Sequence, residues 1–321
     1  MASTPSSKPN HLEPSQLGTK EYWDDLYVAE ISNHALDPTD EGTIWFDDSG
    51  AEDKVLSFLE QKIAEEHILS EGITKLNCSF LDLGTGNGHF LFALREGEED
   101  DDEDDEDEEA EGEGGEAEKG RGWGGRMLGV DYSERSVQFA KRIAAEKGYA
   151  EEQVIEFLNW DIMTESPSSL LASPNEQGWD VVLDKGTFDA ISLSEEKDQR
   201  GRRICEGYRE RVLPLVRKGG VFLVTSCNWT EEELVGWFAD REGEGEGEGE
   251  GGFEVLDRIE YRSFQFGGRK GQSRIVIVGA RLSGSQRGTK LALALVDLGS
   301  LMSQVSGIGF GPTLESNEIL L

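Results

Sequence analysis

Three charged residues with the chemistry of an active site follow an apolar stretch near the middle of the chain. In the segment WDVVLDKGTFDAISL, residues 179–193, the apolar run ends in Asp184 and Lys185, and a second carboxylate, Asp189, comes shortly after. Charged side chains are costly to remove from water unless they are paired or used. The segment is therefore either the solvated end of a buried strand or the mouth of an active site.

A glycine-rich turn forms the second candidate site. The segment FLDLGTGNGHF, residues 80–90, combines Asp82 with Gly84, Gly86 and Gly88. Glycine permits a sharp turn and lets the backbone approach a ligand closely, because it has no Cβ. The spacing departs from the fingerprint of nicotinamide dinucleotide sites and lacks the ending of a triphosphate-binding loop. The turn predicts a ligand of another class, with a purely structural turn as the alternative.

Two further carboxylates follow later apolar runs. Asp131 ends the run in RMLGVDYS, and Asp161 follows the run in VIEFLNWDI. Once the intervening acidic segment is set aside, the spacing from Gly86 to Asp131 approaches the roughly 20 residues expected of a ribose-binding carboxylate. Asp161 is placed to accept the exocyclic amine of a purine. The alternatives are a helix start at Asp131 and a solvated strand end at Asp161.

The elements that must position these residues alternate along the chain. Short apolar runs, typical of buried strands, occupy residues 78–84, 126–133, 154–162, 179–184, 219–227, 253–261 and 273–282. Amphipathic segments, typical of helices, occupy residues 17–31, 52–65, 89–96, 136–148, 198–216 and 230–240. This alternation predicts an α/β fold with a doubly wound, mostly parallel sheet of seven strands. The last two strands lack an intervening helix, which predicts an antiparallel terminal strand at the edge.

Two acidic segments, residues 96–122 and 241–252, contribute much of the net charge of −35. Both link a helix to the next strand, so we expect them at the end of the sheet opposite to the ligand-binding carboxyl ends of the strands. They are either solvated loops or a means of attracting a basic partner. We divide the chain into a disordered tail, residues 1–16, one domain, residues 17–283, and a poorly ordered tail, residues 284–321.

Composition restricts the class of partner and the compartment. The remainder of the chain is also acidic, which disfavours nucleic-acid binding because phosphates are repelled. Cys78, Cys205 and Cys227 form no zinc-binding pattern and are typical of reduced thiols. We see no signal peptide and no apolar run long enough to cross a bilayer. We therefore expect a cytoplasmic monomer without a metal or a membrane contact, with the nucleus as an additional location.

The motifs LDLGTGNG, GVDYS, DKGTFDAISL, LVTSCNWT and FQFGG together resemble the class I, seven-strand methyltransferases that depend on S-adenosylmethionine. More narrowly, DKGTFDAI, TSCNWT and the opening LGTKEYWDDLY and GTIWF are similar to the subgroup that methylates a lysine of translation elongation factor 1-alpha. The resemblance covers roughly residues 17–282. The acidic segments and the last residues depart from the pattern without interrupting a motif.

The resemblance implies roles for residues at both ends of one site. Asp184 would meet the substrate amine, either by holding and orienting the ammonium or as general base, and Asn228 and Trp229 would line the substrate channel. Trp229 and Asn228 are otherwise turn residues before the next helix. Lys185 is expected to pair with a carboxylate, and Asp189 to cap the next helix. The cofactor would be held by Trp45, with Phe46 beside it, and by Asp82, Gly84, Gly86, Asp131, Asp161 and Ile162.

The leading hypothesis is a protein-lysine N-methyltransferase that uses S-adenosylmethionine and acts on elongation factor 1-alpha. One alternative is a methyltransferase whose acceptor is another protein or a small molecule. Another is a non-catalytic module that holds a basic partner. For Trp45 and Phe46, anchoring in the core is the alternative to covering the cofactor. The glycine spacing argues against a nicotinamide oxidoreductase.

Overall fold

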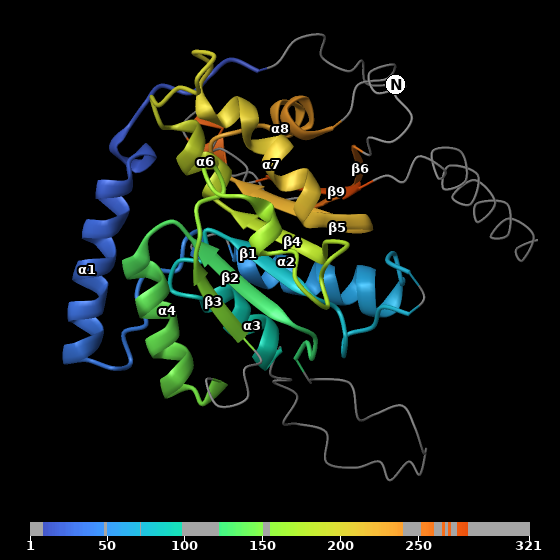
Figure 1. Cartoon of the computed structure of the whole chain (residues 1–321), viewed down its shortest axis with the longest axis horizontal. Helices are drawn as coiled ribbons and strands as arrows, with labels where there is room; N and C mark the ends of the chain where they lie inside the picture. Colours follow the sequence, from blue (N-terminus) through green and yellow to red (C-terminus); the bar gives the residue numbers. More distant parts are fainter. Residues whose placement is uncertain are drawn as a thin grey trace, which may run out of the picture.

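The computed structural model describes most of the expected domain (Figure 1). The described residues are 9–47, 50–70, 72–97, 122–149, 155–239, 252–259, 265–266, 269–270 and 275–281. The predictions for residues 1–8, for most of both acidic segments and for the last 40 or so residues lie outside this part of the chain. For residues 9–16, the prediction of a disordered tail is wrong. Leu12 packs against buried hydrophobic residues, and the backbone N–H of Ser15 donates to the carbonyl of Leu193.

A parallel sheet forms the centre of the molecule. Strands β1 (Phe80–Leu83), β2 (Met127–Asp131), β3 (Ile155–Asn159), β4 (Trp179–Lys185) and β5 (Val216–Ser226) pair in parallel, in the spatial order β3-β2-β1-β4-β5. The predicted α/β fold with a parallel central sheet is confirmed.

Beyond β5, the sheet continues with two strands of opposite direction. Strand β9 (Ile275–Arg281) lies antiparallel to β5, and β6 (Phe253–Ile259) lies antiparallel to β9 on the outside. The last strand of the chain, β9, is therefore antiparallel to both of its neighbours, and it lies one position inside the edge of the sheet. The link between them contains the two-residue strands β7 (Gln265–Phe266) and β8 (Arg269–Lys270), which pair with each other.

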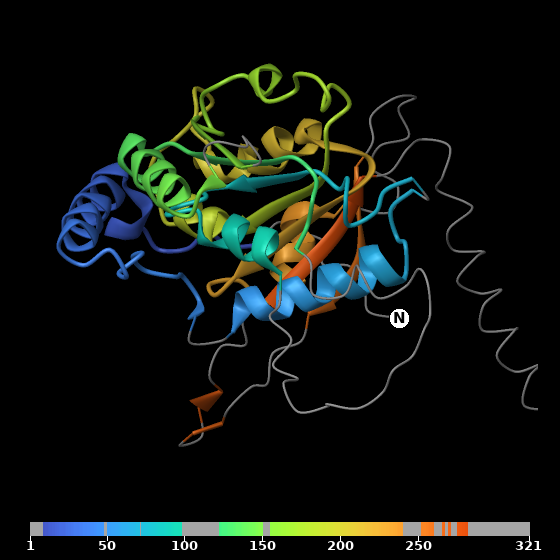
Figure 2. The same ribbon diagram turned by 90° about the horizontal axis from the view of Figure 1, so that it is seen from below.

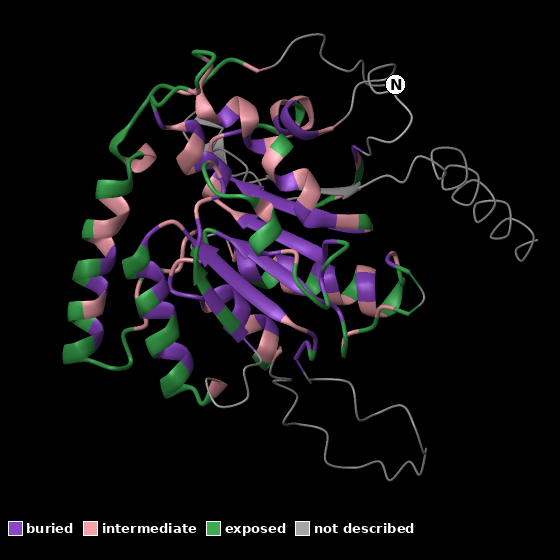
Figure 3. Ribbon diagram, viewed as in Figure 1, coloured by how far each residue is buried: buried purple, intermediate pink, exposed green. Residues whose placement is uncertain are grey.

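Helices cover both faces of the sheet, and each face has its own buried cluster (Figure 2). One face, called the α1–α4 face, carries α1 (Lys20–Leu36), α2 (Ala51–Leu59), α3 (His89–Glu96) and α4 (Glu134–Glu146). The other, called the α6–α8 face, carries α6 (Thr187–Ser192), α7 (Tyr208–Val212) and α8 (Glu231–Phe238). The sheet between the two layers is almost entirely buried in β1, β2, β4 and most of β5 (Figure 3).

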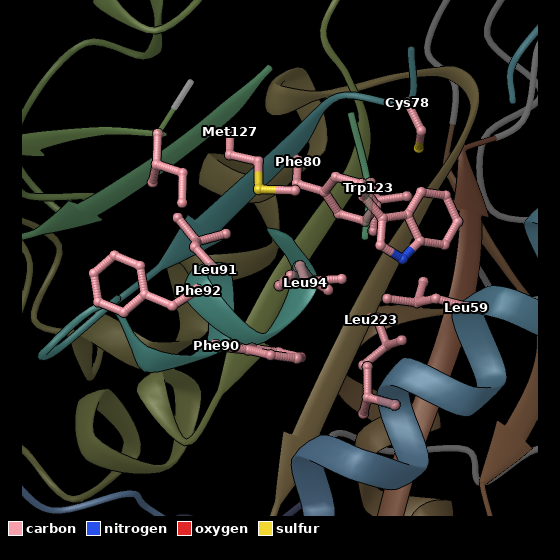
Figure 4. Packing of buried hydrophobic residues seen from close by; sticks show 14 of the residues in the cluster. Leu59, Cys78, Phe80, Phe90, Leu91, Phe92, Leu94, Trp123, Met127 and Leu223 are labelled. Atoms are coloured by element: carbon pink, nitrogen blue, oxygen red, sulfur yellow. The ribbon is translucent and has the colours of Figure 1, made fainter. Parts of the chain in front are cut away.

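Side chains of each strand alternate between these two layers. In β4, Val181 and Leu183 belong to the cluster of the α1–α4 face, whereas Val182 belongs to the cluster of the α6–α8 face. Figure 4 shows the first cluster, in which Phe80 of β1 and Met127 of β2 pack with residues of α3 and with Leu59 of α2. Because alternation has a period of two residues, it also fixes the face of the polar residues at each strand end.

Local sequence signals account for the helix ends. Helix α8 begins with a capping box: Thr230 Oγ1 accepts the N–H of Glu233, and the Glu233 carboxylate accepts the N–H of Thr230. The helix expected over residues 198–216 is much shorter. Two 3₁₀ turns, Ile204–Gly207 and Leu213–Leu215, flank α7, and Pro214 lies in the second turn, where it removes a backbone donor. No helix among the described residues is both long and apolar enough to cross a membrane.

Candidate active site

A cavity of about 900 Å³ lies where the parallel strands end. Its wall includes the residues that terminate or follow four strands, namely Leu83, Asp131, Lys185 and Cys227. This is the end of a doubly wound sheet where ligands bind. The described residues on either side of the first acidic segment lie at the opposite end of the sheet, because α3 ends at Glu96 and β2 begins at Met127.

The glycine turn after β1 provides a wall that only glycine can form. Gly84 has φ +71° and Gly86 has φ +60°, a backbone region that L side chains rarely adopt. A Cβ on Gly86 would lie 2.8 Å from the Tyr27 hydroxyl oxygen, and a Cβ on Gly84 would collide with the Thr187 hydroxyl. Both glycines line the cavity. A side chain at either position would collide with Thr187 or Tyr27, so the turn contributes backbone to the cavity wall.

Two buried carboxylates face the cavity beside this turn. Burial raises the pKa of Asp82 to about 7, although the Thr85 hydroxyl and Lys185 act in the opposite direction. Burial also raises the pKa of Asp131 to about 6, although its carboxylate accepts the N–H of Ser133 at 2.8 Å and of Gly86 at 3.2 Å. A cationic group near Asp82, or hydroxyl donors at Asp131, would offset the cost of burying these charges.

The third strand contributes a more polar wall. Asp161 and Ile162 both line the cavity. The Asp161 carboxylate accepts the N–H of Met163 at 2.8 Å and the Thr164 hydroxyl at 2.7 Å, so it is partly used by its own turn. Tyr132, which follows Asp131, also lines the cavity and presents an aromatic ring there. The binding role of Asp161 and Ile162 remains a prediction.

The loop that carries Trp45 and Phe46 is fastened to the site by a buried charge network. Lys185 Nζ donates to the Trp45 carbonyl at 2.9 Å and lies 3.1 Å from Glu52 Oε1. The other oxygen of Glu52 lies 2.6 Å from His89 Nδ1. Phe46 has φ +69°, a strained backbone for a bulky residue that costs on the order of 1–3 kcal/mol. The network holds this loop against the cavity, and the predicted pairing of Lys185 with a carboxylate is confirmed.

Asp184 does not face the cavity, and its predicted contact with the substrate amine is wrong. It shares its face of β4 with Val182, so its carboxylate points into the α6–α8 layer and is 1% exposed. There it accepts the Tyr208 hydroxyl at 2.6 Å and the N–H groups of Thr187 and Phe188. Burial raises the pKa of Asp184 to about 7. It is a structural cap at the start of α6.

Trp229 is likewise part of the core rather than of a substrate channel. Its ring is 3% exposed and stacks on Phe188 with centroids 5.9 Å apart. The backbone N–H of Trp229 donates to Ser226 Oγ at the end of β5, and the indole ring turns inward from there. Asn228 does line the cavity, as expected. Asp189, expected to cap α6, instead lines the cavity from the first turn of that helix.

Several lining residues come from α1, far away in the sequence. Lys20, Trp23 and Tyr27 line the cavity, and the Trp23 ring lies 5.0 Å from that of Trp45. Trp23 and Tyr27 lie at helical spacing in LGTKEYWDDLY, which indicated a helix with an aromatic face. Nothing in the sequence indicates which strand end this helix approaches. Within the described residues, no group of three or more His, Cys, Asp or Glu side chains could hold a metal ion.

The residues on one wall of the cavity fit S-adenosylmethionine. This wall combines the glycine turn with two buried acids, one suited to a cationic group and one suited to ribose hydroxyls. Apolar and aromatic side chains lie beside them. Asp82, Gly84, Gly86 and Asp131 would hold this cofactor, with Trp45 as a cover.

A family model and curated relatives match more than half of the chain. Residues 74–248 match the family described as "Methyltransferase domain". The protein-lysine N-methyltransferase EFM4 of Saccharomyces cerevisiae is 37% identical over 81% of this chain and 92% of its own length. The human EEF1A lysine methyltransferase 2 is 30% identical over 83% of this chain and 86% of its own length. Magnesium protoporphyrin IX methyltransferase from Synechocystis with bound SAM is 12% identical, with a TM-score of 0.44, over 81% of this chain and 97% of that one. The chain therefore belongs to the S-adenosylmethionine-dependent protein-lysine N-methyltransferases that include EFM4 and EEF1A lysine methyltransferase 2.

Proposed function

We propose that this enzyme transfers a methyl group from S-adenosylmethionine to a lysine side chain of translation elongation factor 1-alpha. The observation that carries this proposal is the identity of 30% to 37% with relatives named for lysine methylation, extending over most of both chains. The match to EFM4 spans 260 residues, 81% of this chain.

The cavity supports a division of labour between two ends. Asp82, Gly84, Gly86 and Asp131 line one part of the cavity, with Asp161 and Ile162 beside them, and we assign this cofactor end to S-adenosylmethionine. Residues after β4 and β5, including Asn228, line another part, which we assign to the substrate as the acceptor end. When bound, S-adenosylmethionine supplies an electrophilic methyl group. The chain itself contributes orientation, since reacting atoms must approach to about 3–3.5 Å in alignment.

The experiment that tests this function uses the purified chain, methyl-labelled cofactor and purified elongation factor 1-alpha. We expect label on lysine of the factor, with the modified residue identified by mass spectrometry. The matched control is Asp131→Asn, which should lose labelling by losing the cofactor. A cell extract in place of the purified factor tests the competing acceptors. Label confined to another protein or to small molecules would contradict the proposed substrate, and cofactor binding without any methyl transfer would indicate a binding module.

A further inference from the structure

Asp189 is a buried carboxylate that lines the acceptor end of the cavity. It lies in the first turn of α6, is 4% exposed and contributes to the cavity wall, as does Asn228 after β5. Its neighbour in sequence, Asp184, is turned into the opposite layer and contacts Tyr208 instead. Of these two acids, only Asp189 can therefore meet a molecule bound in the cavity.

The start of α6 is fixed directly against the glycine turn. The Thr187 hydroxyl donates to the carbonyl of Leu83 at 2.6 Å. Thr187 lies so close to Gly84 that a Cβ on Gly84 would collide with this hydroxyl. Asp189 follows Thr187 by two residues, and its carboxylate is fastened to the end of β5. Oδ1 accepts the Ser226 hydroxyl at 2.5 Å, and Oδ2 accepts the N–H of Cys227 at 2.8 Å. The carboxylate is thus held rigidly between the strands that border the acceptor end.

These donors leave the negative charge of Asp189 without a cation. Within the described residues, no Lys, Arg or His side chain forms an ion pair with it, whereas Asp198 on the same cavity wall pairs with Arg202. The Cys227 side chain and the N–H of Asn228 also act as donors to this carboxylate, but neither carries a positive charge. A buried carboxylate of this kind is costly unless a cation or further donors reach it.

We propose that Asp189 binds and orients the ammonium group of the acceptor lysine, with Ser226 as a positioning residue that fixes the carboxylate. This inference rests on the proposed function, since it takes a lysine as the acceptor. Asn228 borders the same position, and its N–H donates to Ser226 Oγ at 3.2 Å. Charge complementarity then distinguishes lysine from an uncharged side chain of similar length.

The test measures binding rather than turnover. The full-length enzyme, saturated with S-adenosylhomocysteine, is titrated with elongation factor 1-alpha and with the same factor carrying methionine at the modified lysine. We expect the wild type to prefer lysine by roughly 10-fold to 100-fold, the value of a charge-assisted hydrogen bond. Asp189→Asn should bind both factors alike, and Ser226→Ala should retain part of the preference. Asp198→Asn, which removes a paired carboxylate from the same wall, should prefer lysine as the wild type does.

The outcomes separate this role from the proposed function. Unchanged discrimination in Asp189→Asn, with wild-type affinity for S-adenosylhomocysteine, would overturn the role of Asp189 alone. If Asp189→Asn does not fold, Ser226→Ala decides, and full discrimination in that variant overturns the positioning role and the assignment with it. If the wild type binds S-adenosylhomocysteine but neither form of the factor, the proposed substrate is wrong, and the assignment of the lysine contact falls with it.

Discussion

The cofactor end and the acceptor end of the cavity hold their carboxylates in different ways. At the cofactor end, Asp82 and Asp131 are buried on the α1–α4 side of the sheet, beside the exposed backbone of the glycine turn. At the acceptor end, Asp184 is enclosed by α6 and Tyr208, while Asp189 reaches the cavity across the ends of β4 and β5. Proximity along the chain is therefore a poor guide to shared function at the acceptor end.

This contrast separates carboxylates that are enclosed by the fold from those that border the cavity. Asp184 is surrounded by protein donors, namely one hydroxyl and two backbone N–H groups. Asp131 and Asp189 also accept protein hydrogen bonds, but each still borders the cavity. Burial by itself therefore does not mark a candidate binding residue, whereas burial at a cavity wall does.

The largest expected effect is at the cofactor end. Asp131→Asn keeps the size of the side chain but removes the charge and one acceptor, so the affinity for S-adenosylmethionine should fall roughly 10-fold to 100-fold. Isothermal titration calorimetry measures this change. Asp189→Asn is the matched control and should bind the cofactor as the wild type does. An equal loss in both variants would contradict the division of the cavity into two ends.

The next effect concerns stability rather than binding. In Asp184→Asn, the amide cannot accept from the Tyr208 hydroxyl and from both backbone N–H groups at once, so a buried donor loses its partner. We expect the free energy of unfolding to fall by about 1–3 kcal/mol, measured by urea denaturation. A cycle with Tyr208→Phe should show coupling between the two side chains. Wild-type stability combined with loss of the lysine preference would restore a substrate role for Asp184.

A smaller effect is expected from the network that holds the Trp45 loop. Glu52→Gln removes the charge that Lys185 and His89 share, so the loop should close less firmly over the cofactor. We expect the affinity for S-adenosylmethionine to fall about tenfold, corresponding to about 1.4 kcal/mol. The control is Lys62→Gln, which breaks partly exposed ion pairs with Glu66 and Asp257 remote from the cavity. Unchanged affinity in Glu52→Gln would show that the loop does not need this anchor.

The sequence indicated which residues meet at the glycine-turn end of the cavity, and the reasons are physical. Apolar runs that alternate with amphipathic segments specify a buried parallel sheet. The carboxyl ends of parallel strands meet at one edge, so Asp82, the glycines and Asp131 had to lie near one another. The glycines were also informative, because a tight strand-to-helix turn often needs residues with positive φ, as Gly84 and Gly86 have here.

The acceptor end was harder because side-chain direction decides the function there. In β4, the period of two residues places Asp184 with Val182 and places Lys185 with Leu183. This alternation along β4 could be read from the sequence. The sequence did not indicate which helices cover each face of the sheet. Asp189 depends on a six-residue helix, α6, whose orientation is set by contacts with Leu83 and Ser226. Likewise, only tertiary structure brings Tyr27 of α1 to Gly86.

The pH dependence should separate apo stability from cofactor binding at Asp82. Its pKa in the folded protein is raised to about 7, so the folded state holds a proton that the unfolded chain has already released above about pH 4. The contribution of Asp82 to stability is therefore fully present below about pH 4 and is lost as the pH rises through 7. The effect of pH on cofactor affinity has the opposite sign to its effect on stability. A cationic cofactor favours the ionised carboxylate, so affinity should rise with pH, by at most about tenfold per unit, until about pH 7.

Two measurements on the wild type and on Asp82→Asn check these opposite signs. Thermal unfolding of the apo protein should show that the wild type loses stability relative to the variant between about pH 4 and pH 7. Titration with S-adenosylmethionine over the same range should show affinity that rises in the wild type and changes less in the variant. The pKa of Asp82 also depends on Lys185, Glu52 and Asp131. Because the wild type and Asp82→Asn both retain these residues, the difference between the two proteins cancels their own titration to first order. If affinity in the wild type is independent of pH while the variant binds equally well, the cationic part of the cofactor does not lie at Asp82.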